Sequence, residues 1–458
     1  MISVHRIADV RLNAAALLLA FYATAIALSD GALRWLLAGA VLLVPFFRWI
    51  LLAPNAWLAA FFAAALLTPP FPVAPGNSGP HAAVMVAVLG ALVGVLRLRE
   101  WNFPRTFLTS VLAAFSVMLL FSAALAAIYS GAEIGAESLA RAGLSAISVY
   151  VFFYVSAGPG RAGSLSPASL YAAAFASAAF ACLDFFRPFP APAGFGNQFV
   201  WLDSGVYRRA QGLFYEAGAL GNFCAFGVVM TAVALLRGVG KRLVLLGGMC
   251  VFAAALILSY SRASGLNALV ALATLAFLER ARFRRRGLAW AGAAVIGCAA
   301  LIFAMISGHA AAYWTRLWFS ATSLFSYPDR IFGGRLESWA TLLRFLAANP
   351  WYAIFGVGYK TLPYSDFIGE RVVADNMYLS MLVETGIVGL ALLLAMNFAI
   401  LRAGYRAARS IDREKSFYGA AIFCFWAGET VQMLSADVLT FWRLLPLYFW
   451  ALAMAARG

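Results

Sequence analysis

The sequence contains little charge. Only 12% of its 458 residues are Asp, Glu, Lys or Arg, whereas 64% are hydrophobic, and a soluble protein carries about twice that charged fraction. Apolar runs of about 15–25 residues, the length that a membrane-spanning helix needs, recur along the whole chain. These features exclude a string of soluble domains. They predict an all-α fold, a polytopic bundle of transmembrane helices.

Histidine and cysteine are also scarce. The three histidines, His5, His81 and His309, lie far apart in the sequence, which does not match the ligand spacing of a metal site. The five cysteines fall inside apolar runs and their number is odd, so no disulfide framework is indicated. We therefore expect neither a metal nor a cofactor.

Acidic residues are outnumbered by basic ones. The 34 Lys and Arg against 19 Asp and Glu give a net charge of +15, which could suggest a nucleic-acid partner. However, the basic residues gather in alternate loops between the apolar runs, the pattern of cytoplasmic loops in membrane proteins. We therefore expect no nucleic-acid partner, both termini in the cytoplasm, and the other set of loops outside.

The apolar runs between these loops predict fourteen spans, and about 12–14 when their boundaries are allowed to move by a few residues. The predicted spans are 12–28, 32–47, 56–70, 82–96, 106–128, 142–157, 167–185, 216–236, 242–260, 263–279, 287–307, 377–401, 417–434 and 438–456.

Two of the outer loops are long, about 186–215 and 308–376. The second contains "GGRLESWATLLRFLAANP" (333–350), where apolar residues recur at helical spacing and Pro350 marks the end. We expect an amphipathic helix here, at the outer membrane boundary. The chain is thus divided into N-terminal transmembrane helices (1–204), further transmembrane helices (205–307), an extracytoplasmic loop (308–376) and C-terminal transmembrane helices (377–458).

Polar side chains gather on the predicted outer side. Several arginines near a carboxylate would suit a polyanionic lipid head group such as a diphosphate, because a guanidinium binds phosphate oxygens bidentately and stays charged. The carboxylate could act as a general base toward an attacking hydroxyl. These outward-facing candidates are Arg208, Arg209, Glu216, Arg262, Arg335, Tyr359, Lys360, Asp375, Asn376 and Tyr378.

Each candidate has a simpler interpretation. Arg208 and Arg209 could be solvated loop charges, and Arg335 could anchor the surface helix. Asp375 could cap the helix that follows it, a common role for Asp before an apolar run. Two glutamates, Glu384 and Glu429, fall inside predicted spans, where we expect each to pair with an arginine or to hydrogen-bond a neighbouring helix.

The order of the motifs resembles a known family. "GLFYEAGALGNF", "LSYSRASGLNAL", "GGRLESW…NPWYAIFGVGYKTLP" and "ADNMYLSMLVETGIVGLALL" resemble, in sequence, the landmarks of the O-antigen ligase and polymerase superfamily (Wzy/WaaL-like enzymes). The resemblance covers residues 205–400. The preceding spans contribute little beyond their hydrophobicity.

This resemblance implies a membrane glycosyltransferase that moves a glycan from an undecaprenyl-diphosphate carrier to an acceptor hydroxyl, without metal or nucleotide. It implies that Arg262 and Arg335 neutralise the diphosphate leaving group. Asp375 stands where the ligases place a histidine, and the Asp375–Asn376 pair resembles the polymerases. We therefore expect a polymerase of O-antigen or exopolysaccharide repeat units in the bacterial inner membrane, with its active site facing the periplasm and a chain-length regulator as a possible partner.

Two other functions stay open. An O-antigen ligase or a protein O-oligosaccharyltransferase would use the same donor. A transporter of lipid-linked glycan belongs to another class, and such proteins tend to show internal repeats and broken helices near the membrane midplane. No convincing repeat is present here, and the charged cluster is predicted at the outer boundary.

Overall fold

The structure is a computed structural model that describes residues 22, 24, 27, 45–71, 81–162, 165–192, 194–202, 205–280, 311–323, 326 and 335–457. The predicted span 287–307 and most of the spans 12–28 and 32–47 lie outside these residues. The chain divides into two compact units, Met1–Trp57 and Leu58–Gly458. In the first unit, the described part includes the helix Pro45–Leu52.

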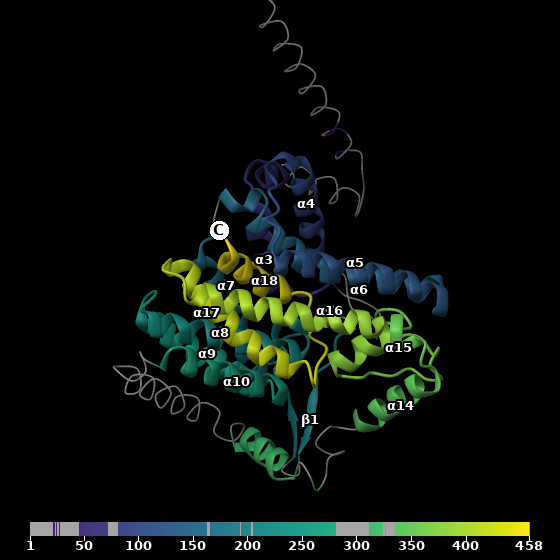
Figure 1. The fold of residues 1–458 in the computed structure, drawn as a ribbon. Helices are drawn as coiled ribbons and strands as arrows, with labels where there is room; N and C mark the ends of the chain where they lie inside the picture. Colours follow the sequence, from purple (N-terminus) through teal and green to yellow (C-terminus); the bar gives the residue numbers. More distant parts are fainter. Residues whose placement is uncertain are drawn as a thin grey trace, which may run out of the picture. The chain divides into compact units, whose positions relative to one another are not determined.

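The described part of the second unit is almost entirely helical (Figure 1). Its helices are α3 (Ala56–Leu67, which begins at the end of the first unit), α4 (Ala82–Leu96), α5 (Phe107–Ser130), α6 (Ala132–Ser156), α7 (Pro167–Phe186), α8 (Ala217–Arg237), α9 (Arg242–Leu258), α10 (Arg262–Leu278), α14 (Arg335–Ala348), α15 (Tyr352–Phe355), α16 (Met377–Ala408), α17 (Arg413–Gln432) and α18 (Leu445–Ala456). A further helical segment covers 311–322. One hairpin, β1 (Phe199–Leu202) and β2 (Gly205–Arg208), pairs antiparallel with Phe199 opposite Arg208.

Five of the described helices, α5, α6, α7, α8 and α16, are long and apolar enough to cross a membrane, or up to six spans if one bent helix pair counts as a span. Four shorter apolar helices, α4, α9, α10 and α18, accompany them. The all-α, multi-pass membrane fold predicted from the sequence is confirmed. Most predicted spans within the described residues match a helix within a few residues, and the predicted amphipathic helix corresponds to α14.

Two predicted spans have wrong starts. The span predicted at 142–157 belongs to α6, which begins ten residues earlier because its first turns are amphipathic rather than apolar. Glu133 and Glu137 are exposed there, while Gly135 and Ser138 are buried. The span predicted at 438–456 begins late, because 438–440 form a 3₁₀ turn and α18 starts only at Leu445.

The centre of the bundle contains a buried polar network. Glu429 of α17 is fully buried and accepts hydrogen bonds from the side-chain amides of Asn222 (α8, 2.6 Å) and Asn267 (α10, 2.5 Å). Gln432, one turn further along α17, accepts from the same two amides at 3.1 and 2.9 Å. Because an unpaired polar group is costly in an apolar interior, this network fixes how α8, α10 and α17 meet.

The long helix α16 is interrupted near its start. Gly386 has φ 71° and ψ −172°, so the backbone leaves the helical conformation there. The released carbonyl of Glu384 accepts from the Gly358 amide (2.9 Å) and the Ser122 hydroxyl (3.0 Å), while the Glu384 side chain accepts from the Leu362 amide (3.3 Å). Glu384 thus binds the neighbouring helix α5 through its carbonyl, in line with the sequence prediction, and the backbone of the long loop through its side chain.

We expect Gly386→Ala to destabilise the protein. A Cβ at this position would clash with the Ile354 carbonyl oxygen, and the positive φ disfavours any L side chain. The expected loss is roughly 1–3 kcal/mol of unfolding free energy, measured as a lower melting temperature in detergent. Gly143→Ala on α6 is the control, because its Cβ would meet nothing within 4 Å. Equal melting temperatures for the two variants would contradict this role of Gly386.

Candidate active site

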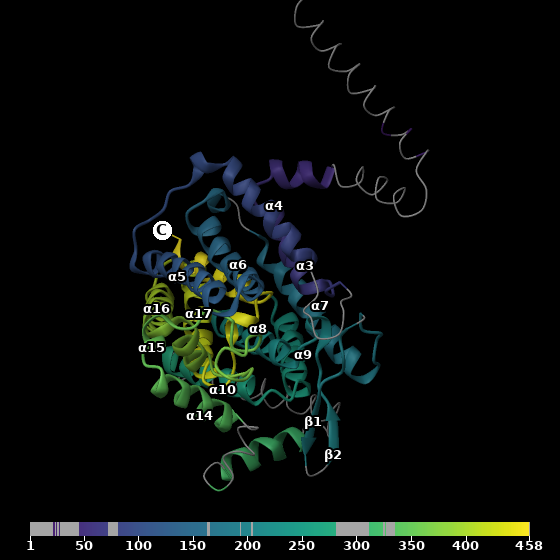
Figure 2. The same cartoon turned by 90° about the vertical axis from the view of Figure 1, so that its right-hand side faces the viewer.

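Four arginines from separate segments converge near the start of α16. Arg209 follows β2, Arg262 begins α10, Arg316 lies on the helix 311–322, and Arg335 begins α14. Figure 2 shows the hairpin, α10 and α14 gathered toward the same end of the second unit. The four guanidinium groups interact electrostatically with one another, and each repels its neighbours. The site is therefore a concentration of positive charge.

The turn between α9 and α10 holds this cluster together. Its carbonyls accept from three side chains: Ser259 O from Arg209 Nε (2.9 Å), Tyr260 O from Arg316 Nη1 (2.5 Å), and Ser261 O from the Tyr313 hydroxyl (3.1 Å). These last two donors both come from the helix 311–322, so the turn joins that helix to the site.

Arg262 completes the link between the two segments. Its Nη1 donates to the Ser320 hydroxyl at 2.7 Å. The helix 311–322 is therefore bound both to the turn before α10 and to the first residue of α10. Tyr260, in the turn between α9 and α10, is fully buried and has a positive φ of 51°. That left-handed residue turns the chain so that successive carbonyls are available to different partners.

Burial and mutual repulsion act on the charges of the cluster. Burial lowers the pKa of Arg316 to about 10, and the neighbouring Arg262 and Arg209 contribute to that lowering. Burial also lowers the pKa of Arg209, against the opposite influence of Glu216. Both groups stay protonated at neutral pH. Holding like charges together is unfavourable, so an anion bound among them would be strongly favoured.

Asp375 is paired with one of the arginines. Its Oδ2 accepts from Arg335 Nε at 3.0 Å and lies 2.9 Å from Nη2. It does not cap the helix: the cap of α16 is Asn376, whose side chain accepts from the Leu379 amide at 3.1 Å. The capping interpretation of Asp375 is therefore wrong by one residue, and the Asp375 carboxylate is available to orient Arg335.

Glu216 presents the free carboxylate of the site. It occupies the residue before α8, yet its side chain makes no capping bond, and in the described part of the chain no hydrogen bond to its carboxylate is formed. The residue is exposed to solvent, although many protein atoms surround its carboxyl group. Burial raises its pKa; Arg209 and Lys360 oppose that effect, while the charges of Asp375 and Asp437 add to it.

Backbone conformation marks the same region. The described non-glycine residues with positive φ are Tyr215, Tyr260, Lys360 and Asp375. Lys360 and Asp375 are candidates themselves, Tyr215 directly precedes Glu216, and Tyr260 lies two residues before Arg262. Such conformations cost on the order of 1–3 kcal/mol each and are typical of functional sites.

Other predicted residues lie outside the arginine cluster. Arg208 is committed to Asp184 at the end of α7, with a salt bridge of 3.0 Å and a 2.7 Å hydrogen bond to its carbonyl. Tyr378 donates to the Thr430 carbonyl at 2.8 Å and so attaches α16 to α17. Arg208 and Tyr378 therefore have structural partners that hold them away from the cluster.

Two further predicted residues, Lys360 and Tyr359, lie beside the arginine cluster. Lys360 forms a salt bridge with Asp437. Burial alone would lower the pKa of Lys360, but the negative charge of Asp437 outweighs this effect and the pKa is raised. The Tyr359 hydroxyl is buried, 3.4 Å from that of Ser145 on α6.

Sequence reasoning missed Arg316 and Asp437. Arg316 lies in "YWTRLWF", between the exposed Trp314 and Trp318, so an amphipathic pattern was available to indicate a second surface helix. Asp437 directly precedes the 3₁₀ turn Val438–Thr440. The sequence prediction includes this turn in the span 438–456.

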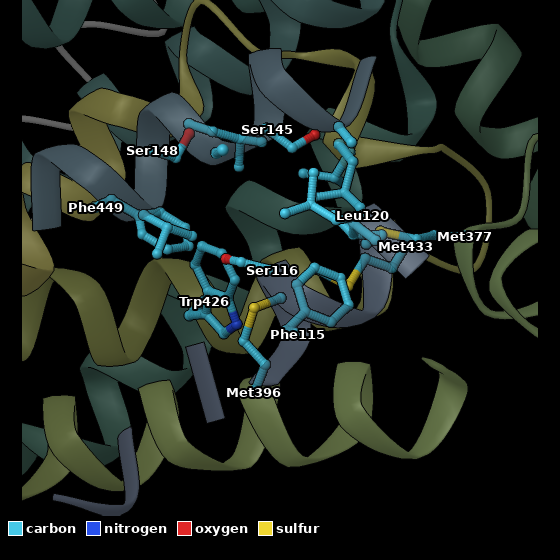
Figure 3. A pocket seen from close by; sticks show the side chains of 17 residues that line it. Phe115, Ser116, Leu120, Ser145, Ser148, Met377, Met396, Trp426, Met433 and Phe449 are labelled. Carbon is cyan, nitrogen blue, oxygen red and sulfur yellow. The ribbon is translucent and has the colours of Figure 1, made fainter. Parts of the chain in front are cut away.

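An apolar recess lies beside the start of α16. Figure 3 shows Met377 and Met433 at one end and Phe449 and Trp426 toward the other, with the Ser145 and Ser148 hydroxyls along one wall. Its walls come from α5, α6, α16, α17 and α18.

The fold and the site together define a multi-pass helical membrane protein with a cationic site and a carboxylate, that of Glu216, which accepts no hydrogen bond from the described residues. Residues 247–394 match the family model described as O-antigen ligase, and the match confirms the resemblance of this chain to the O-antigen ligase and polymerase superfamily. The matched segment contains Arg262, Arg316, Arg335 and Asp375. This match indicates a membrane enzyme that transfers glycosyl groups. No curated protein matches the sequence.

Proposed function

We propose that this protein polymerises undecaprenyl-diphosphate-linked oligosaccharide repeat units, of an O-antigen or an exopolysaccharide, on the outer face of the bacterial inner membrane. The observation that carries the proposal is the convergence of Arg209, Arg262, Arg316 and Arg335 near the carboxylate of Glu216, which accepts no hydrogen bond from the described residues. This combination matches a reaction in which a diphosphate leaves and a hydroxyl attacks.

In the proposed reaction, the acceptor hydroxyl oxygen attacks the anomeric carbon of the donor. The bond from that carbon to the diphosphate oxygen breaks, with inversion, and undecaprenyl diphosphate leaves. Arg262 and Arg316 stabilise the negative charge that develops on the leaving oxygen, usually the largest catalytic contribution. These fixed charges would do what a divalent cation does in other transferases, so the proposed step needs no metal.

The two carboxylates take different roles in this proposal. Asp375 is already paired with Arg335, so it holds that guanidinium toward the diphosphate. Glu216 has no hydrogen-bond partner among the described residues, and its raised pKa makes it a stronger base than an ordinary glutamate. We therefore assign the proton of the acceptor hydroxyl to Glu216, whereas the sequence favoured Asp375.

Purified protein in liposomes with lipid-linked repeat units should produce a ladder of longer glycans. If the protein is instead a ligase, glycan should move once to a lipid or protein acceptor without a ladder. If it is a transporter, units should cross the bilayer with no new glycosidic bond. Either of these two results would overturn the polymerase assignment.

The orientation of the long loop is a separate prediction. Glu370 lies in this loop and Ile411 in the basic loop between α16 and α17, and both are exposed. In a cysteine-free background, Glu370→Cys should react with an impermeant maleimide in intact cells, and Ile411→Cys only after lysis. The reverse labelling pattern would place the arginine cluster on the cytoplasmic side.

A further inference from the structure

A second recess lies next to the Lys360–Asp437 pair. Its walls come from α6, from the loop around 359–364, and from the turn that precedes α18, segments that are far apart in the sequence. It has a volume of about 70 Å³ and remains open at its rim, where Thr440 is exposed. Leu439 belongs to both this recess and the apolar one of Figure 3, so the two are neighbours.

The lining of this second recess combines aromatic rings with charged groups. Arg141 donates to the Tyr364 hydroxyl at 2.9 Å and also lies 5.8 Å from the centre of that ring. Trp442 forms another wall, and its ring meets that of His81 edge-on at 5.7 Å. Arg141, Tyr364 and Trp442 are each only partly buried. Aromatic faces beside hydrogen-bonding groups suit a sugar ring, which has apolar C–H faces and a polar rim.

The pair beside the recess has unused acceptor capacity. Asp437 binds Lys360 through Oδ2, while its Oδ1 is buried and accepts no hydrogen bond within the described residues. The same holds for Oε2 of Glu384, whose charge also acts on Lys360. A buried acceptor without a donor is unfavourable, so both carboxylates keep acceptor capacity close to Lys360, which lines the recess.

The position of the recess fits a transfer reaction. The Glu216 carboxyl interacts with Arg209 and Asp375 of the arginine cluster, and also with Lys360 and Asp437 of the pair beside the recess. Glu216 therefore lies within electrostatic range of both regions. In an inverting transfer the acceptor hydroxyl attacks the anomeric carbon from the side opposite the leaving diphosphate, and the proton acceptor must lie close to that hydroxyl.

We propose that the recess lined by Arg141, Tyr364 and Trp442 binds a sugar ring of the acceptor glycan. Calling this glycan the acceptor rests on the proposed function. The recess binds the glycan that accepts the transfer, and the arginine cluster binds the diphosphate of the donor.

Binding of a carrier-free glycan tests this assignment. The probe is the oligosaccharide released by mild acid from lipid-linked units that accumulate in a strain lacking this protein, and saturation-transfer NMR reports its binding to purified protein. Arg141→Ala and Tyr364→Ala should each weaken binding at least tenfold. Arg344→Ala should bind as the wild type does, because Arg344 is exposed and its hydrogen bonds within the described residues stay inside α14. Arg262→Ala should also bind normally, because the probe has no diphosphate.

A blocking variant covers the case in which the alanine variants fold poorly. Thr440 is exposed at the rim, so Thr440→Trp should fill the recess, keep the melting temperature and abolish binding. No binding by the wild type, unchanged binding by Thr440→Trp, or loss of binding only in Arg262→Ala would overturn the proposal. If the glycan binds here but liposomes yield no ladder, the sugar site stands and the polymerase function fails. If a ladder forms without recess-dependent binding, the polymerase function stands and the sugar site fails.

Discussion

Arg316→Ala should lower polymer formation by about 10²–10³-fold, the usual effect of removing one fixed group that stabilises a developing negative charge. The protein should still reach the membrane, because Arg316 gives up a single described hydrogen bond, to the Tyr260 carbonyl. Arg316→Lys should recover only a small part of the activity, since an ammonium group lacks the planar fork of donors. The readout is ladder formation per unit of purified protein in liposomes.

Arg208→Ala is the matched control for this prediction. Arg208 and Arg209 are adjacent in sequence and equally basic, but Arg208 is bound to Asp184 and Arg209 faces the cluster. We expect Arg208→Ala to reduce thermal stability and to leave the rate per folded molecule nearly unchanged. Arg209→Ala should instead reduce the rate per folded molecule and leave the thermal stability nearly unchanged. If both variants lose the same rate, electrostatic stabilisation by the cluster does not explain catalysis.

Glu216→Gln should nearly abolish turnover, by about 10²–10⁴-fold, because an amide cannot accept the proton of the attacking hydroxyl. Asp375→Asn should have a smaller effect that appears mainly as weaker binding of the donor, since it loosens Arg335 and leaves the base intact. Steady-state kinetics with purified lipid-linked units separates the two, as a loss in kcat for the first and a rise in KM for the second.

The pH dependence sharpens this assignment. A base works only when deprotonated, so the rate should fall as the pH drops through the pKa of Glu216, which burial raises from that of an ordinary glutamate. The negative charge of Asp375 contributes to that raised pKa, so Asp375→Asn should move the acid limb of the profile to lower pH. Arg209→Ala removes a positive charge and should move it to higher pH. An acid limb that neither variant shifts would remove Glu216 from the role of base.

The sequence contained enough to predict the helices and part of the site. Hydropathy predicts helices whose surfaces are apolar throughout, such as α4 and α8, to within a few residues. It misses the start of α6, where one face is polar and only the other is buried. Motif order brought Arg262, Arg335 and Asp375 to the same region, and the structure places all three there.

The partner that each side chain binds could not be predicted from the sequence in the same way. Arg208 is the last residue of β2 and Arg209 follows it, and in extended chain successive side chains point to opposite sides. One therefore reaches Asp184 and the other reaches the cluster, a difference that their shared chemistry conceals. Likewise, Asp375 and Asn376 are both good caps, and the backbone decides between them: Asp375 is left-handed and Asn376 is extended.

The central claim is that the arginine cluster recognises a diphosphate. The most direct measurement compares the binding of undecaprenyl diphosphate and undecaprenyl monophosphate to the purified protein in nanodiscs. The wild type and Arg208→Ala should both bind the diphosphate at least tenfold more tightly, and the double variant Arg262→Ala/Arg316→Ala should lose this preference. Equal affinity of the wild-type protein for the two lipids, or an unchanged preference in the double variant, would contradict the claim.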